Sequence, residues 1–168
     1  MPTSTLNPRP THAKLGLLGW LVLCFGAAAV GGLASANAGD FYSLLVQPSW
    51  APPGWLFGPV WTVLYAVMGV SAWLVWKERG WQAARTELSV FVVQLVANGL
   101  WTWLFFVWHM GAVAFAEILL LWVLIAYTAW AFWRIRPLAG ALLLPYLAWV
   151  SFASVLCFAM WQGNPQIL

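Results

Sequence analysis

Charge is what this 168-residue sequence has least of, with only seven Lys or Arg and four Asp or Glu. Charged residues make up 7% of the chain, whereas about 25% is usual for a soluble globular domain. Hydrophobic residues make up 64%, and the mean hydropathy is +0.85. This composition excludes a soluble domain and predicts an integral membrane protein.

Residues that carry chemistry are also scarce. Cys24 and Cys157 each lie inside an apolar run, at different expected depths, so we expect no disulfide framework. His12 lies in the N-terminal tail and His109 at a loop, which leaves no cluster to ligate haem iron or another metal. The sequence also has no paired carboxylates and no nucleophile beside a base. We therefore expect no metal and no required cofactor.

Long apolar segments fill most of the chain. Because a membrane-spanning helix needs about 20 apolar residues, the length and spacing of these segments predict an all-α fold. The expected architecture is a polytopic membrane protein, a five-transmembrane-helix bundle with a long ordered loop between helices 1 and 2. A mobile tail (1–14) precedes the single domain (15–162), and a short C-terminal tail (163–168) follows it. The expected spans are 15–36, 58–76, 88–108, 112–133 and 138–161.

The first segment, 15–36, has two interpretations. It ends in Ala34-Ser35-Ala36, which resembles a signal-peptidase site, but cleaved signals have a shorter apolar core of about 7 to 15 residues. The length favours a retained span. Small residues crowd its second half, between Gly26 and Gly32, which lets a neighbouring helix approach closely or leaves room for a ligand.

The connection from Asn37 to Leu56 is twenty residues, which is long for a compact bundle. Pro52 and Pro53 predict a stiff, extended approach to the second span, and Pro59 fits the first turn of that span. We therefore expect an ordered loop with a defined shape.

Three tryptophans, Trp50, Trp55 and Trp61, fall within twelve residues of this loop and the following helix. One interpretation is an aromatic belt at the membrane interface, which many membrane proteins have. The other is an aromatic lid over a pocket. The residues alone leave both open.

Basic residues are divided unequally between the two sides of the expected bundle. The side with the N-terminus and the loops after the second and fourth spans holds all seven Lys and Arg, and the other side holds only Asp40. The positive-inside rule then predicts an N-terminus on the cytoplasmic-like side. The scattered cations form no stripe that would suit a nucleic acid.

Polar side chains within the spans fall on shared helical faces. Gln94, Asn98 and Trp101 share one face of the third span, and the second and fifth spans have aromatic faces of their own. Any one of these polar side chains could simply form a hydrogen bond that holds two helices together, with no part in binding a ligand. Three converging aromatic faces instead predict a flat-walled apolar cavity for a large planar ligand.

Glu117 stands alone in the fourth span, with Leu121 on its face. No Lys or Arg lies at a depth that could pair with it. Two states remain open, a neutral carboxyl group or one hydrogen-bonded to a neighbour such as His109 or an amide.

Four motifs together resemble the TspO or tryptophan-rich sensory protein family, also known as the translocator protein or peripheral benzodiazepine receptor family. The resemblance covers nearly the whole chain from the first span to Asn164. The motifs are P-S-W-A-P-P with F-G-P-V-W-T-V-L-Y (48–65), W-K-E (76–78), Q-L-V-A-N with W-x-x-x-F-F (94–106), and P-Y-L-A-W-V-S-F-A (145–153).

The resemblance implies a five-helix bundle, often dimeric, whose first loop covers a cavity. It also implies binding of porphyrins such as protoporphyrin IX and haem, of isoquinoline carboxamides and benzodiazepines, and of cholesterol in animal members. Bacterial members are linked to tetrapyrrole regulation and stress or light responses. Light-dependent porphyrin breakdown, proposed for some members, implicates the positions of Trp61 and Trp149.

Two residues depart from the family pattern. No basic residue follows Arg136, although the cholesterol-recognition pattern needs one soon after a tyrosine of the fifth span. Cys157 stands where the family commonly has Asn, which removes an amide from the cavity side or a helix interface.

The leading hypothesis is a receptor or carrier for porphyrins or other planar hydrophobic molecules, working as a homodimer among membrane lipids, with no nucleic acid partner. The alternatives are a light-dependent porphyrin-degrading enzyme that uses Trp61 and Trp149, and a lipid or sterol transporter. The cell membrane of a bacterium is the expected location, with inner and outer membranes both open. The expected ligand-binding residues are Tyr42, Trp50, Phe57, Trp61, Tyr65, Gln94, Asn98, Trp101, Glu117, Leu121, Tyr146, Trp149 and Ala153.

Overall fold

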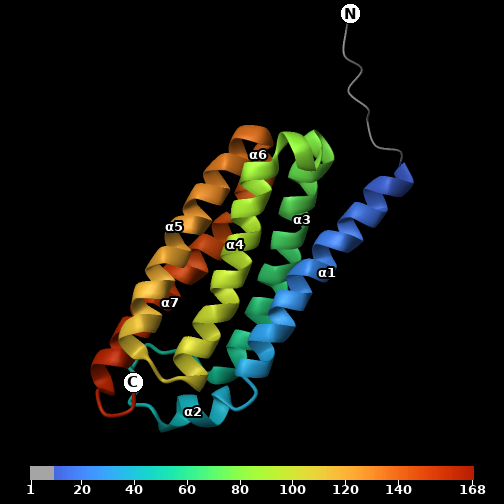
Figure 1. Cartoon of the computed structure of the whole chain (residues 1–168). Helices are drawn as coiled ribbons and strands as arrows, with labels where there is room; N and C mark the ends of the chain where they lie inside the picture. The colour runs from blue at the N-terminus through green and yellow to red at the C-terminus, as the bar shows by residue number, and fades with distance from the viewer. Residues whose placement is uncertain (1–9) are drawn as a thin grey trace, which may run out of the picture.

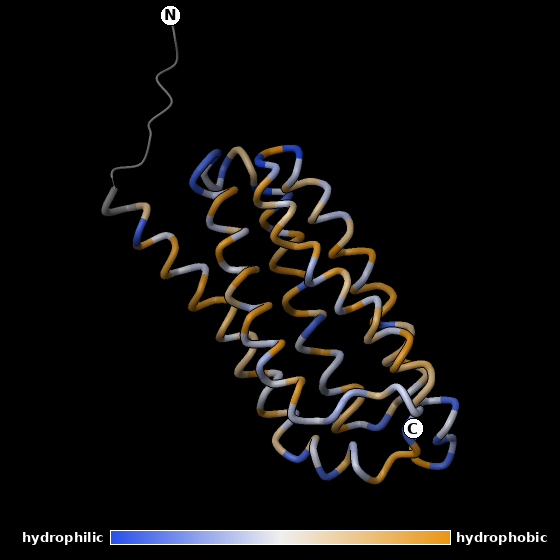
Figure 2. Tube along the Cα trace, turned by 180° about the vertical axis from the view of Figure 1, so that it is seen from behind, coloured by the Kyte–Doolittle hydropathy of each residue, from blue (hydrophilic) through white to orange (hydrophobic). Residues whose placement is uncertain are grey.

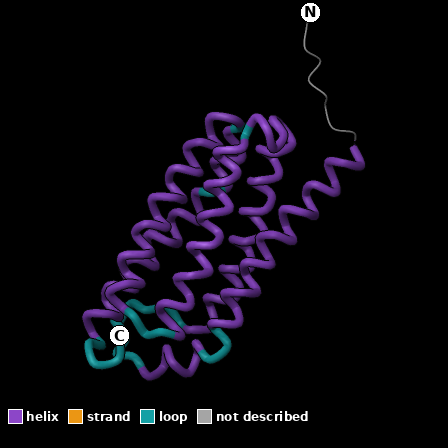
Figure 3. The backbone as a smooth tube through the Cα atoms, viewed as in Figure 1, coloured by secondary structure: helices purple, strands orange, loops and turns teal. Residues whose placement is uncertain are grey.

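A computed structural model describes residues 10–168 of the chain as an all-helical bundle (Figures 1 and 3). Residues 1–9, most of the expected N-terminal tail, lie outside the described residues, and residues 10–14 belong to the first helix. The five long helices are α1 (Pro10–Ala34), α3 (Phe57–Ala83), α4 (Arg85–Thr102), α5 (Gly111–Ile135) and α7 (Leu144–Gly163).

The prediction of five spans is confirmed. The described residues contain five helical segments that are long and apolar enough to cross a membrane, and no strand. The fifth segment, 137–163, is divided into α6 (Pro137–Leu142) and α7, each with a proline in its first turn. Pro145, in the first turn of α7, has no N–H to continue the hydrogen bonds of α6, and Leu143 forms the turn between the two helices.

Helices α3, α4, α5 and α7 pack side by side, and α1 lies against α3 and α4 on one side of the bundle (Figure 1). The N-terminal half of α1 diverges from the other helices towards the end that holds α6 and the α3–α4 turn. The close approach of α1 to α3 depends on Gly69, where a Cβ would lie 2.8 Å from the Leu21 side chain. A small residue at this position lets the two backbones meet.

Helix α3 extends past the expected end of its span at residue 76. Lys77, Glu78 and Arg79 form its last polar turn, and Gly80, at φ 70°, breaks the helical conformation. Glycine adopts this left-handed region without the steric penalty of a Cβ. The chain can therefore turn back into α4, with its charged residues at the end of the bundle.

The opposite end of α4 continues into a π-helical turn, η2 (Trp103–Val107). The amide of Trp108 donates to the carbonyl of Trp103 at 2.9 Å, and that of Met110 to Leu104 at 2.9 Å. His109 follows with φ 52°. The wider turn changes the direction of the aromatic side chains at this end of α4 relative to a regular helix.

Apolar residues run along the helices, and hydrophilic residues gather at the two ends of the bundle (Figure 2). Many large apolar side chains on the outer faces are exposed, including Leu120, Val123 and Trp130 on α5. A soluble domain would bury such a surface, whereas lipid chains cover it in a membrane. The chain is an integral membrane protein.

Candidate ligand cavity

A cavity of about 330 Å³ lies between α1, the loop after it, and the loop-side halves of α3, α4 and α7. Its lining is mostly apolar. The structure brings together eight of the thirteen expected site residues on this lining, from four different elements. They are Tyr42, Phe57, Trp61, Tyr65, Asn98, Trp101, Trp149 and Ala153.

Aromatic rings form the walls of the cavity. The ring centroid of Trp61 lies 5.7 Å from that of Tyr65, and Phe57 meets Trp149 edge to face at 5.8 Å. Trp101 stacks on Phe105 at 5.3 Å with an interplanar angle of 16°. These contacts fix the rings in place, so the cavity offers flat apolar surfaces of defined orientation.

Asn98 is the polar centre of one wall. It accepts a hydrogen bond from the Tyr65 hydroxyl at 2.5 Å and donates one to the Tyr146 hydroxyl at 2.9 Å. Tyr146 is fully buried behind the cavity and does not line it. The network links α3, α4 and α7, and leaves a short polar strip in an apolar surface.

Trp101 and Trp149 line the cavity with their rings, but their indole N–H groups are inaccessible to a water-sized molecule and bond to no oxygen or nitrogen within residues 10–168, and that of Trp101 lies beside the Cys157 sulfur. A buried donor without a partner costs free energy, about 1 to 3 kcal/mol. The lining therefore offers ring faces rather than open indole donors, which favours a flat apolar molecule.

The end of helix α1 and the residue after it form the wall with the least side-chain bulk, made of Ala28, Gly31, Gly32 and Ser35. The expected site list did not include them, although the run of small residues in this segment indicated space for a ligand or a neighbouring helix. The other lining residues absent from that list are Phe25, Ala38, Gly39, Gly54, Gly58, Thr62, Thr102 and Phe106.

The loop between α1 and α3 is ordered and covers one end of the cavity. It contains α2 (Ala38–Leu44) and the 3₁₀ turn η1 (Gly54–Leu56). The Tyr42 hydroxyl donates to the Pro52 carbonyl at 3.0 Å, and Gln47 Nε2 donates to the Tyr42 carbonyl at 2.7 Å. Burial raises the pKa of the Tyr42 hydroxyl, so it remains a donor.

Asn164, just after α7, holds the same loop in place. It accepts from the Val46 amide at 2.8 Å and donates to the Val46 carbonyl at 3.1 Å. This pair of bonds joins residues 118 positions apart and ties the loop to the end of the fifth span.

The loop tryptophans do not build the lid. Trp55 is 73% exposed, and Trp50 is 47% exposed with its ring against Phe152 at 5.9 Å. Neither lines the cavity, which Tyr42, Gly54 and Phe57 cover instead. Amphipathic indoles in this position suit the membrane interface, the other interpretation of the pattern.

Five expected site residues lie off the lining. They are Trp50, Gln94, Glu117, Leu121 and Tyr146. Gln94 lies one turn away from Asn98 along α4, and neither its amide oxygen nor its nitrogen has a partner among the described residues. Their part in ligand binding stays a prediction.

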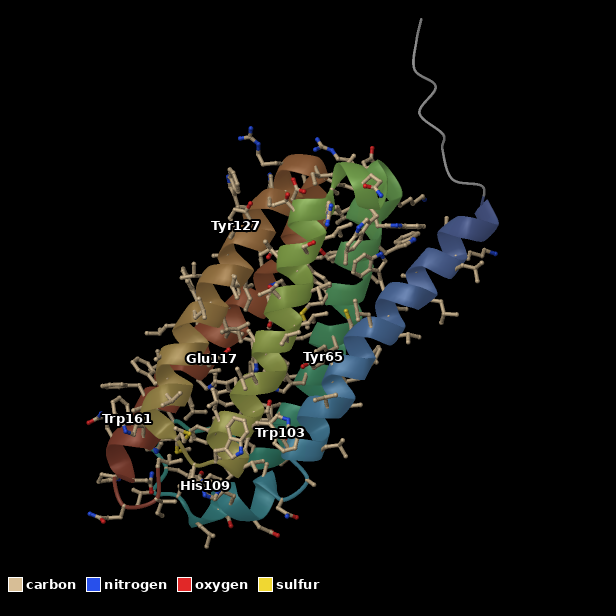
Figure 4. The ribbon with its side chains drawn as sticks, viewed as in Figure 1. Tyr65, Trp103, His109, Glu117, Tyr127 and Trp161 are labelled. Atoms are coloured by element: carbon tan, nitrogen blue, oxygen red, sulfur yellow. The ribbon has the colours of Figure 1, made fainter. Side chains whose placement is uncertain are left out.

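Glu117 projects from α5, while Tyr65 lies on α3 across the bundle (Figure 4). Both carboxyl oxygens of Glu117 are buried, with no hydrogen-bond partner among the described residues. The suggested partner, His109, stacks on Phe41 at 4.3 Å. Of the two states left open by the sequence, hydrogen bonding to His109 is not found.

Residues 10–168 contain no group of three His, Cys, Asp or Glu side chains placed to hold a metal ion. Cys24 and Cys157 are both buried free thiols. The cavity can recognise a ligand through the faces of its aromatic rings and through a few polar side-chain groups.

The fold and cavity define a class of protein, namely five-span integral membrane proteins with an internal aromatic cavity under an ordered loop. The profile of the TspO/MBR family matches residues 20–162. The chain belongs to the TspO/MBR family.

Several known proteins are similar to this sequence over most of its length. The tryptophan-rich protein TspO of Chlorobaculum tepidum is 41% identical over 152 residues, 86% of this chain and 96% of that protein. The human translocator protein is 40% identical over 126 residues, 74% of this chain and 75% of that protein. Protein CrtK of Rhodobacter capsulatus is 37% identical over 151 residues, 87% of this chain and 91% of that protein.

Proposed function

We propose that this protein is a membrane receptor or carrier that binds a porphyrin, protoporphyrin IX or haem, in the aromatic cavity and thereby regulates tetrapyrrole levels or stress signalling. The observation that carries the proposal is the wall of fixed rings around Trp61 and Trp149 on the cavity lining. A porphyrin has a large flat π-face, which matches these rings.

The volume of the cavity is that of a small-molecule pocket. Its volume of about 330 Å³ falls within the range of about 300 to 1,000 Å³ usual for pockets that hold drug-sized molecules. The small residues of α1, among them Gly31 and Gly32, form one side of this volume. The apolar lining favours a ligand that partitions into the membrane.

The test is a tryptophan-fluorescence titration of the detergent-purified protein with protoporphyrin IX, first in the dark and then under illumination. The companion variant is Trp61→Phe with Trp149→Phe, which keeps two aromatic faces and removes two indoles. We expect saturable quenching in the wild type and at least about tenfold weaker binding in the variant, since two stacking surfaces shrink.

A matched control is the double variant Trp55→Phe with Trp130→Phe, since both side chains are exposed and neither lines the cavity. It should bind protoporphyrin IX as the wild type does, within about twofold. Quenching that never saturates in the wild type would contradict a porphyrin site.

A second candidate function is light-dependent breakdown of the bound porphyrin. Trp61 lies next to two tyrosines, with ring centroids 5.7 Å from Tyr65 and 6.1 Å from Tyr146, so an electron taken from the indole could be replaced by a neighbour. A new absorbance product that appears only in the light, and is missing from the Trp61→Phe, Trp149→Phe variant, would favour this enzyme. Unchanged spectra with retained ligand would favour the receptor.

We also propose that the protein works as a homodimer in the cell membrane of a bacterium, with its N-terminus on the cytoplasmic side. The six described Lys and Arg residues all belong to the same end of the bundle, that of the α3–α4 turn. Lipid or sterol transport remains the alternative if protoporphyrin IX does not bind.

A further inference from the structure

A second crevice opens at the positively charged end of the bundle, far from the loop that covers the aromatic cavity. Its volume is about 420 Å³, and it lies between the α3–α4 turn and the last turns of α5. Tyr127 marks its position in Figure 4, near the opposite end of the bundle from His109. Its lining consists of Arg79, Glu87, Tyr127, Trp130, Ala131, Arg134 and Ile135.

The crevice carries more positive than negative charge. Arg79 and Arg134 contribute two guanidinium groups, against the single carboxylate of Glu87. Within residues 10–168 the one ion pair joins Arg136 to Glu78 at 3.7 Å, so neither crevice arginine forms a direct ion pair with a carboxylate. The guanidinium of Arg134 lies 5.8 Å from the centre of the Trp130 ring, which restricts its movement. Two available guanidinium groups suit a phosphate, which they bind with paired N–H donors.

An apolar stripe runs from the crevice along the outer face of α5. Leu120, Val123, Tyr127, Trp130 and Arg134 are spaced by three, four, three and four residues, so they share one helical face. Leu120 and Val123 are each 57% exposed. Over the 14 steps from Leu120 to Arg134 the helix rises about 21 Å, so an acyl chain attached to a headgroup at Arg134 can lie along the stripe.

We propose that this crevice binds the headgroup of an anionic phospholipid, phosphatidylglycerol. Arg79 and Arg134 donate to the phosphodiester oxygens, and Glu87 accepts from the glycerol hydroxyls beyond the phosphate. One acyl chain packs on the stripe formed by Leu120 and Val123. Basic pockets at the surface ends of membrane helices provide the charge complementarity that anionic headgroups require. The site is separate from the aromatic cavity and does not depend on what that cavity binds.

The experiment is native mass spectrometry of the full chain released from detergent, titrated with phosphatidylglycerol or with phosphatidylcholine of the same acyl chains. Phosphatidylglycerol should bind more tightly than phosphatidylcholine. The double variant Arg79→Gln, Arg134→Gln should bind phosphatidylglycerol about tenfold to thirtyfold more weakly, since each basic residue near a membrane surface contributes about a factor of five to anionic lipid binding. Its affinity for phosphatidylcholine should fall less, because the choline cation of that lipid already offsets the phosphate charge that the arginines attract.

The matched control is Lys77→Gln with Arg85→Gln, which removes two charges from the same end of the bundle but none from the crevice. It should keep phosphatidylglycerol binding within about twofold, because its side chains do not line the site. An equal loss in the control and the crevice variant would overturn the proposal in favour of diffuse attraction between charges. Equal binding of the two lipids to the wild type would overturn it as well.

One further variant and one competitor test the paired donors and the acyl chains separately. The variant Arg79→Lys, Arg134→Lys keeps both charges but loses the paired donors, and it should show an intermediate loss even if the glutamine variant fails to fold. Glycerol phosphate, which has the headgroup without acyl chains, should not displace phosphatidylglycerol at equal concentration. Displacement would mean that a soluble phosphate ester is the ligand and would overturn the lipid assignment.

Discussion

The side-chain amide of Asn98 holds one wall of the cavity together. It joins two hydroxyls, from Tyr65 and Tyr146, at a position where its side chain is only 4% exposed. In an apolar interior each of these groups would otherwise lack a partner. The same residue therefore fixes the relative positions of α3, α4 and α7 and orients the Tyr65 ring on the lining.

Replacing this amide with an apolar side chain of similar size should destabilise the fold. For Asn98→Leu we expect a loss of about 2 to 4 kcal/mol in the free energy of unfolding, because two buried hydroxyls lose their partner. Denaturant unfolding in detergent, followed by circular dichroism, measures the change.

The control for that substitution is Asn37→Leu, the same chemical change at an exposed residue whose side chain makes no capping hydrogen bond. It should alter the free energy of unfolding by no more than about 0.5 kcal/mol. Equal effects of the two substitutions would show that the Asn98 network does not stabilise the protein.

At the scale of whole elements, helix packing depends on positions where no side chain fits. Gly140 in α6 lies against α5, and a Cβ there would fall 2.7 Å from the Ala129 carbonyl oxygen and 2.6 Å from the Trp133 Cβ. Backbone cannot give way as a flexible side chain can, so α6 reaches its place only with glycine at this position.

Gly140→Ala should therefore lower the free energy of unfolding by about 1 to 3 kcal/mol through overpacking. Gly19→Ala is the matched control, because a Cβ at Gly19 would meet nothing within 4 Å. Gly19→Ala should leave the free energy of unfolding unchanged or raise it by up to about 1 kcal/mol, since alanine favours a helix more than glycine does. Comparison of the two thermal transitions in detergent tests the contact, and a neutral Gly140→Ala would contradict it.

The loop over the cavity is the second element whose position depends on few contacts. Asn164→Ala removes both side-chain hydrogen bonds to Val46 and so frees the middle of the loop from α7. We expect protoporphyrin IX to dissociate about threefold to thirtyfold faster, as the loss of one to two hydrogen bonds of about 1 kcal/mol each implies.

Stopped-flow recovery of tryptophan fluorescence measures this dissociation rate. Gln162→Ala, at an exposed residue two positions earlier, is the control and should leave the rate unchanged. A rate in Asn164→Ala equal to that of the wild type would show that the loop does not limit ligand release.

At the scale of the whole molecule, the two ends of the bundle differ in charge. The end with the α3–α4 turn carries Lys77, Arg79 and Arg85, whereas the described part of the opposite end carries no Lys or Arg. Insertion machinery retains basic loops on the cytoplasmic side. The phospholipid crevice and the aromatic cavity would then face opposite surfaces of the membrane.

This orientation predicts how introduced cysteines react in intact cells. In a background of Cys24→Ala with Cys157→Ala, Gln82→Cys in the last turn of α3 should resist a membrane-impermeant maleimide until the cells are opened. Gln166→Cys near the C-terminus should react from outside, because it lies at the other end of the bundle. The reverse pattern would contradict the proposed topology.

Sequence alone determined the fold class and the family, because long apolar segments have few stable arrangements in lipid and a helix satisfies its own backbone. It also predicted the order of the loop from its prolines and found eight lining residues from face spacing and resemblance, among them Trp61 and Trp149. These features are local, or repeat with the helix period, so they are visible in a single chain.

Only the tertiary structure decided which faces meet. Helical spacing places Gln94 and Asn98 on one face of α4, but the packing of α3 and α1 brings Asn98 alone to the cavity. The loop tryptophans could not be assigned from sequence, since their direction depends on the tie between Val46 and Asn164, 118 residues apart. The wall of α1 and the crevice between Arg79 and Arg134 likewise arise from contacts between distant segments, which no local pattern encodes.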